Sequence, residues 1–158
     1  MSERFSTAGM WIGYCAEATA NTRPTTGYTK IPEVKSMPSF NPAPETIEST
    51  TLEETEYKTY VKGLKDLGGA LEYNANMTDD LVTAWQTLIT TFNTTVATGK
   101  KVWFVVVHPQ LAQAVYFTGD PSTIGLNEAS VGGMAETTLY ITPTSAPVMA
   151  AKPTVTTT

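Results

Sequence analysis

The chain has few of the residues on which catalysis, metal binding and disulfide bonding most often depend. Its 158 residues include one cysteine and one histidine. Cys15 has no second cysteine, so neither an intrachain disulfide nor a cysteine metal site can form. His108 stands before a proline at the end of an apolar run, where a turn residue is commoner than a catalytic base. The sequence also lacks phosphate-binding, dinucleotide-binding and EF-hand motifs, so we predict no enzymatic activity, no metal and no cofactor.

Charge is scarce as well, and positive charge especially so. Charged residues make up 16% of the chain, and the net charge is −5. The one adjacent basic pair is Lys100 and Lys101, which argues against a protein that grips nucleic-acid phosphates. Five acids follow one another with no lysine or arginine among them: Glu45, Glu48, Glu53, Glu54 and Glu56. They indicate either a solvated acidic loop or a surface that repels a polyanion such as DNA.

Long hydrophobic runs are missing too. The first twenty residues have no basic region followed by an apolar core, so we predict neither a signal peptide nor a membrane anchor, and synthesis in the cytoplasm. The chain is instead rich in threonine, which makes up more than a sixth of it. Threonine favours strands and keeps a surface polar without charge. The composition therefore predicts a β protein with much uncharged, hydrogen-bonding surface.

Residues 21–52 differ in composition from the rest. Prolines recur through this polar segment at Pro24, Pro32, Pro38, Pro42 and Pro44. That density disfavours helices and central strands, so we predict a long extended loop. An apolar residue nevertheless occurs every three positions: Tyr28, Ile31, Val34, Met37 and Phe40. A purely solvated linker would not carry them, and we predict that residues 21–52 form an assembly arm that packs on another subunit.

Two alternating runs follow the proline-rich segment. In residues 54–62 and 71–77, β-forming or apolar residues alternate with polar ones, which predicts two strands with one wet and one dry face. The glycine-containing connection, residues 63–69, predicts that the two strands form a hairpin. Glu54, Glu56 and Glu72 would then lie on or beside its wet faces.

A single amphipathic helix is predicted next. Thr78 is a candidate N-cap, and Gly99 marks the end. One apolar stripe comprises Leu81, Trp85, Leu88, Ile89 and Phe92. Further strands are predicted at 102–107, which we expect to be covered on both faces, at 112–118 and at 136–142, with a turn at 119–122. We predict one domain over residues 1–145 and a flexible tail over 146–158.

This order of elements resembles the major tail proteins, or tail tube proteins, of long-tailed bacteriophages. The resemblance covers the layout from about residue 10 to 145. It is clearest from YKTYV at residues 57–61, through KGLKDLGG at 62–69 and ALEYNANM at 70–77, to the helix and the strand after it. It implies a mainly β fold (α+β), a small β-sandwich or barrel with a flanking helix and a long extended loop. Related folds occur in contractile injection machines, so the resemblance specifies a tube rather than one type of tail.

The resemblance also implies a function. Tail tube proteins are structural virion proteins, made in the host cytoplasm, that assemble into hexameric rings stacked into a hollow tube. Their implied partners are other copies of themselves, a tape measure protein, a tail terminator and tail-tip proteins. DNA passes through the lumen without specific binding, which an acidic wall would favour. Our candidates for lumen-facing acids are Glu54, Glu56 and Glu72.

The composition leaves a second interpretation open. A monomeric β-sandwich that binds a receptor or a carbohydrate would also be rich in threonine and poor in charge. The two interpretations differ in residues 21–52, which should become protected on assembly in a tube subunit and behave alike at every concentration in a monomer.

Overall fold

A computed structural model of the chain describes residues 6, 8–65, 69–127 and 131–155. This part of the chain is mostly β with one helix, α1 (Asp79–Ala97), as the sequence predicts. The strands are β1 (Trp11–Ala16), β2 (Thr26–Lys30), β3 (Val34–Ser36), β4 (Pro44–Glu48), β5 (Tyr60–Lys65), β6 (Leu71–Asn76), β7 (Val102–Val107), β8 (Gln113–Pro121), β9 (Glu136–Pro143), β10 (Val148–Ala151) and β11 (Thr154–Val155).

Within the described residues, nine of these strands form one sheet in the order β11-β2-β1-β7-β8-β9-β6-β3, with β10 also paired to β8. Strand β8 divides the sheet into two halves. Its earlier residues pair with β7 and β10, whereas Gly119, Asp120 and Pro121 pair with β9. A Cβ atom at Gly119 would lie 2.6 Å from Cγ2 of Ile141, so the close approach of β8 and β9 requires glycine there. The predicted turn at 119–122 is therefore wrong, because the strand continues to Pro121.

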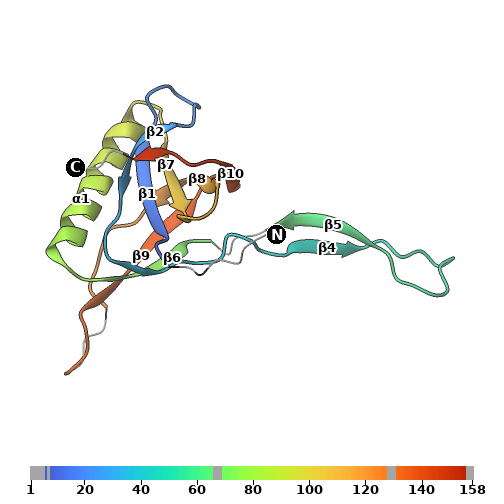
Figure 1. Cartoon of the computed structure of the whole chain (residues 1–158). Coiled ribbons are helices and arrows are strands. Elements are labelled where there is room, and N and C mark those ends of the chain that lie inside the picture. The colour runs from blue at the N-terminus through green and yellow to red at the C-terminus, as the bar shows by residue number, and fades with distance from the viewer. Residues whose placement is uncertain (1–5, 7, 66–68, 128–130, 156–158) are drawn as a thin grey trace.

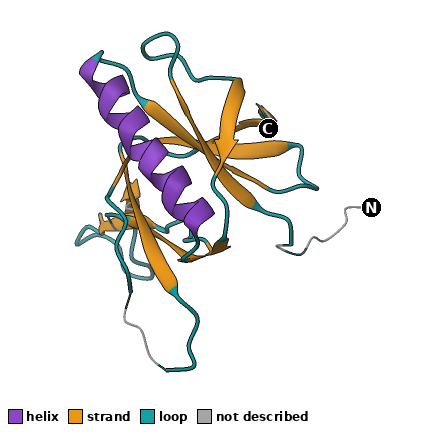
Figure 2. Cartoon of the chain, turned by 90° about the vertical axis from the view of Figure 1, so that its left-hand side faces the viewer, coloured by secondary structure: helices purple, strands orange, loops and turns teal. Residues whose placement is uncertain are grey.

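The two halves face each other across one apolar core, which makes the fold a β-sandwich. Buried side chains from both halves and from the helix share it: Ile12, Tyr14, Ile31, Leu71, Tyr73, Ala75, Leu81, Trp85, Leu88, Val102, Phe104, Val106, Phe117, Leu139 and Ile141. Helix α1 lies across the strands, as Figure 2 shows. A smaller cluster on the other face of β7 contains Tyr28, Val105, Val107, Ala114 and Tyr116. Strand β7 is thus covered on both faces, as its continuous apolar run predicts.

The helix begins and packs as predicted. The Thr78 hydroxyl accepts a hydrogen bond from the Leu81 amide at 3.2 Å, which satisfies one of the free amides of the first turn. Leu81, Trp85 and Leu88 are buried, whereas Ile89 and Phe92 lie partly buried against the same core. The Trp85 indole donates to the carbonyl of Ser122 at 2.7 Å, so it also ties the helix to the end of β8.

The predicted hairpin between residues 54–62 and 71–77 is wrong. Strand β6 does form, but it pairs with β9 and β3. Strand β5 begins only at Tyr60 and pairs with β4, and together these two form a separate hairpin that projects from the body (Figure 1). Of the predicted connection, residues 66–68 lie outside the described part. Alternation specifies which side chains share a face of a strand, but it does not specify the partner strand.

The predicted extended loop over residues 21–52 also needs correction, because β2, β3 and β4 lie within it. Pro24, Pro32, Pro38 and Pro42 fall between the strands, and Pro44 is the first residue of β4, a position that tolerates proline. Counting prolines therefore underestimates the strands, because each proline falls where a ladder hydrogen bond is not needed.

The end of the chain is ordered over its described part, so the predicted flexible tail 146–158 is wrong there. Strand β10 pairs with β8, and β11 pairs in parallel with β2. The hydroxyl of Tyr116 on β8 donates to the carbonyl of Ala151 at 2.5 Å, and this bond holds the end of β10 against β8. Residues 156–158 lie outside the described part.

The place of Tyr28 can be tested by truncation. Tyr28 has an exposed fraction of 0% and its hydroxyl donates to the carbonyl of Pro24, whereas Tyr57 is 81% exposed. We expect Tyr28→Ala to lower the free energy of unfolding by about 3–5 kcal/mol. The matched change Tyr57→Ala should alter it by no more than about 0.5 kcal/mol. Urea unfolding followed by circular dichroism, at a concentration where the protein is monomeric, measures both. Equal, small effects would place Tyr28 outside the core.

Candidate functional site

The β4–β5 hairpin carries apolar side chains that its own subunit does not cover. Ile47 and Val61 are directly opposed in the ladder, so they share one face of the hairpin. Ile47 is 56% exposed and Val61 is 54% exposed. Leu64 is 84% exposed and lies beside Glu45. Because Glu45 is two residues before Ile47 on β4, it shares the face of Ile47, and Leu64 extends that face. We call Ile47, Val61 and Leu64 the apolar face of the hairpin.

The other face of the hairpin is more polar. Thr46 is opposed to Lys62, and Glu48 to Tyr60. The ladder shifts register between Pro44 and Thr46, near Gly63. A Cβ atom at Gly63 would lie 3.1 Å from the Glu45 carbonyl oxygen, so a glycine eases the close approach of the two strands at this β-bulge.

Hydroxyl groups order the far end of the hairpin. The Ser49 amide donates to the Thr59 carbonyl at 2.8 Å, and the Thr59 amide donates to the Thr50 hydroxyl at 2.9 Å. The Thr59 hydroxyl donates to the Glu54 carboxylate at 3.2 Å. A two-stranded hairpin is marginally stable in water by itself, and an exposed apolar face is typical of a surface that binds another molecule.

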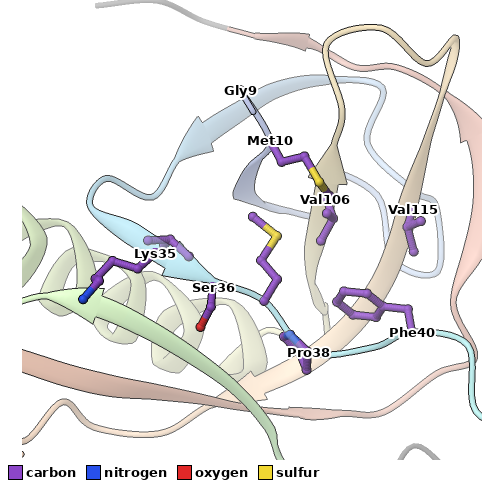
Figure 3. Close-up of a pocket in the computed structure, with 10 residues that line it drawn as sticks. Gly9, Met10, Lys35, Ser36, Pro38, Phe40, Val106 and Val115 are labelled. Carbon is purple, nitrogen blue, oxygen red and sulfur yellow. The ribbon is translucent and has the colours of Figure 1, made fainter. Parts of the chain in front are cut away.

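A cavity of about 600 Å³ lies beside β3, at the margin between the two halves of the sheet (Figure 3). We call it the β3 cavity. Its apolar lining comes from the segment just before β1, from β3, β7 and β8, and from the segment after β3: Met10, Val34, Met37, Phe40, Val106 and Val115. The Phe40 ring packs on Phe117 with centroids 5.4 Å apart, which anchors this segment to the core. Strand β3 ends the sheet order, so it offers a free edge beside the cavity.

The five residues that were predicted to lie on an inter-subunit arm are buried in, or packed against, the core of their own subunit. Tyr28 and Ile31 are fully buried inside their own subunit, so the prediction is wrong for these two. Val34, Met37 and Phe40 are partly buried against the core and line the β3 cavity. Contact of these three with another subunit stays a prediction. The periodic apolar residues fix this segment to the body, and the projecting element comes after them.

The outer face of β6 and β9 is polar and mostly uncharged. Asn74 on β6 donates to the Ser36 hydroxyl on β3 at 3.0 Å. Its side-chain carbonyl accepts from the Thr138 hydroxyl on β9 at 3.3 Å, and Thr138 accepts from Asn127 at 3.0 Å. We call these four residues, with the exposed Glu72 beside them, the polar face. Lys35 and Glu136 form an ion pair near its edge, so these two charges offset each other.

The three candidate lumen acids do not form one surface. Glu72 lies on the polar face, opposite Tyr140 of β9. Glu54 and Glu56 lie at the far end of the β4–β5 hairpin. The structure separates them because the two strands expected to pair belong to different sheets. Their exposure to a lumen stays a prediction.

His108 and Tyr73 of the body could in principle take part in catalysis, but their contacts are those of residues that stabilise the fold. His108 lies just after β7, where its Nδ1 accepts from the Gln110 amide at 3.1 Å and its Nε2 contacts the Ser6 carbonyl. Tyr73 has a buried hydroxyl, and burial raises the pKa of this phenol far above its usual value. Within the described ranges no cluster of three or more His, Cys, Asp or Glu residues could hold a metal ion. None of the described residues form a helix long and apolar enough to cross a membrane.

Comparison with known proteins depends on structure, because no protein-family model and no curated protein matches the sequence. A chain of the anti-feeding prophage baseplate, a 6-fold symmetrised cryo-EM structure, matches 96% of this chain and 98% of its own length, with a TM-score of 0.60 and 10% identity. A chain from the tail of the empty gene transfer agent particle, refined with C6 symmetry, matches 94% of this chain and 100% of its own length, with a TM-score of 0.56 and 18% identity. The chain has the fold of a phage tail-type protein.

A third match agrees with this fold. A chain in the native gene transfer agent virion aligns with 78% of this chain and 89% of its own length, with a TM-score of 0.50 and 20% identity. The phage tail-type sandwich with a flanking helix, expected from the order of elements, is confirmed. The β4–β5 hairpin was not predicted from the sequence. Its local signals are two short pairs of β-forming residues, Thr46–Ile47 and Tyr60–Val61, on either side of a polar segment.

The apolar face of the hairpin yields a test by paired substitution. We expect Ile47→Ser with Val61→Ser to change the free energy of unfolding of the monomer by only about 0.5 kcal/mol, because both side chains are already more than half exposed. Self-association should weaken at least about tenfold, since burying each apolar side chain in a contact contributes about 1.5–3 kcal/mol. Sedimentation velocity over a concentration series measures this. The matched control on the opposite face, Thr46→Ser with Lys62→Ser, should associate like the wild type; equal losses in both would contradict the assignment.

Proposed function

We propose that this chain is a structural virion subunit that assembles into stacked hexameric rings and so forms the hollow tail tube through which DNA is delivered. The observation that carries the proposal is a complete core joined to a projecting hairpin whose apolar face is uncovered. A subunit of this kind has a core that is stable alone, whereas the apolar face of its hairpin is covered only by contact with another molecule. The same fold occurs in particles whose structures have six-fold or C6 symmetry, which supports hexameric rings.

The sheet edges support ring formation. Within the described residues, β3 ends the main sheet order and β10 pairs only with β8. Such edges can pair with strands of a neighbouring copy. A head-to-tail contact closes into a ring when the rotation between subunits divides a full turn. The projecting hairpin then supplies a contact beyond the immediate sheet edge, as stacking of rings requires.

The polar face is the best candidate for the lumenal wall. Three hydrogen bonds link Ser36, Asn74, Thr138 and Asn127 into a chain, and the exposed carboxylate of Glu72 lies beside them. A wall of uncharged groups with an added carboxylate offers no fixed cation to DNA phosphates, so DNA can slide past it. Glu54 and Glu56 lie at the far end of the β4–β5 hairpin, apart from this face, and their exposure to the lumen stays a prediction.

The proposed partners follow from the same role. Other copies of this chain form the tube, and a tape measure protein, a tail terminator and tail-tip proteins contact its lumen and ends, as the resemblance to tail tube proteins implies. The protein would be made in the host cytoplasm and end in the tail of the virion. It would act without a catalytic site, a cofactor or sequence-specific binding of DNA.

Electron microscopy of the purified protein over a concentration series tests the proposal. We expect rings or hollow tubes of uniform width, with six subunits in class averages of end-on views. Solution mass measured on the same samples should rise with concentration. A strictly monomeric particle at every concentration would contradict self-assembly and favour the monomeric receptor- or carbohydrate-binding module.

The lumen assignment can be tested by labelling in a Cys15→Ser background. We expect Glu72→Cys to react with a large polyethylene glycol maleimide in the monomer and to be protected at least about tenfold in tubes, because the reagent cannot enter the lumen. Gln86→Cys, on the exposed side of α1, should react in both states. A small maleimide should still reach Glu72→Cys in tubes. Reaction of Glu72→Cys with the large reagent at the Gln86→Cys rate in tubes would overturn the assignment.

A further inference from the structure

The N-terminal segment enters the fold at the β3 cavity. Gly9 and Met10, the last residues before β1, belong to the lining of this cavity. A Cβ atom at Gly9 would lie 3.0 Å from Cγ of Pro109, and the carbonyl of Ser6 contacts Nε2 of His108. Residues 6 and 9 therefore both contact the turn that follows β7, beside the cavity.

We propose that the first five residues of the chain, which lie outside the described part, fold back over the β3 cavity and that the side chain of Phe5 fills it. The occupant belongs to the same subunit, so this inference does not depend on self-assembly. It assigns the cavity to a segment of this chain and makes that segment a lid over the margin of the sandwich.

The backbone keeps Phe5 within reach of the cavity. Phe5 stands four positions before Gly9, so the Cα atoms of the two residues lie at most about 14 Å apart. A turn at residues 8–9, in which Gly9 has a φ of 84°, changes the direction of the chain just before β1. The contact between Ser6 and His108 then places the next residue of the segment on the body. Phe5 is thus the direct neighbour of a residue that is positioned beside the cavity.

The chemistry of Phe5 matches the lining better than that of its neighbours. It is the one aromatic residue among the first nine, and the other residues from 2 to 7 are polar or charged. An aromatic side chain buries a large apolar area, so a single aromatic among polar residues is suited to act as an anchor. The polar neighbours can stay in water while Phe5 is inserted. The cavity offers an apolar lining of Met10, Val34, Met37, Phe40, Val106 and Val115.

Two methionines in the wall suit an aromatic occupant. Met10 and Met37 line the cavity, and Figure 3 shows the Met10 side chain extending towards Val106. Methionine is flexible and its sulfur makes favourable contacts with aromatic rings. Pockets of about 300–1,000 Å³ hold whole drug-sized ligands, so a cavity of about 600 Å³ has room for an aromatic side chain and the backbone beside it. Filling the cavity supplies the van der Waals contacts that its lining lacks when it is empty.

Chemical labelling of a cavity residue tests the proposal. In a Cys15→Ser background, Met37→Cys reports on the cavity, and its reaction with a small maleimide is followed over a series of concentrations at which the protein is monomeric. We expect the further change Phe5→Ala to raise the reaction rate at least about tenfold, because the reagent then enters an open cavity. The matched change Arg4→Ala, one residue away, should alter the rate by no more than about twofold.

Two controls separate opening of the cavity from loosening of the whole fold. Gln86→Cys, on the exposed side of α1, replaces Met37→Cys and should react alike with and without Phe5→Ala. Val115→Cys repeats the measurement from another wall of the cavity. A synthetic peptide with the sequence of residues 1–7 should slow the labelling of Met37→Cys in the Phe5→Ala protein, whereas the same peptide with Phe5→Ala should have no effect.

The outcomes decide the inference without reference to tubes. Faster labelling of Met37→Cys on loss of Phe5, by a factor that stays the same across the concentration series, supports it. Equal rates with and without Phe5 overturn it, and so does an equal acceleration at Gln86→Cys. Protection that grows with protein concentration also overturns it, because the occupant would then come from a second copy. Since every measurement is made on the monomer, failure of this inference leaves the proposed function standing.

Discussion

Packing of β6 and β9 against β1, β7 and α1 across one apolar core is the interaction on which the rest of the molecule depends. Strand β8 belongs to both halves of the sheet, and the missing side chain at Gly119 lets it come close to Ile141. The inward-facing apolar side chains of the sandwich are buried against one another within one subunit. Apolar side chains also remain exposed outside that core, above all on the β4–β5 hairpin. Contact with another molecule is the way in which these side chains can be buried.

The two exposed surfaces differ in character, and that difference supports a role as a wall. Ile47, Val61 and Leu64 form an apolar face whose free energy falls when a neighbour covers it. Ser36, Asn74 and Thr138 bond to one another, so the polar face loses nothing by remaining in water. A subunit that must be covered on one side and wet on another suits a closed assembly with an aqueous interior.

Local elements of this fold can be predicted from sequence, and long-range pairing cannot. The Thr78 cap, the Leu81–Trp85–Leu88 stripe and the run at 102–107 each depend on neighbours a few residues away, and all three are confirmed. The hairpin prediction failed because alternation in residues 54–62 fits any partner strand, and β4 lay inside a segment that its prolines made look unstructured. Tyr28 and Ile31 were placed on an arm because spacing alone does not tell a contact within a subunit from one between subunits. The β3 cavity brings together residues 10, 37 and 115, a juxtaposition that only the tertiary structure reveals.

The central claim is that another copy of the chain covers the apolar face of the β4–β5 hairpin. A cryo-EM reconstruction of the assembled protein, at a resolution that traces side chains, tests it most directly. The account predicts six-fold rings in which each β4–β5 hairpin lies against the body of a different subunit, with Ile47 and Val61 removed from solvent. Rings or tubes in which the hairpins extend into solvent, with both side chains still exposed, would contradict it.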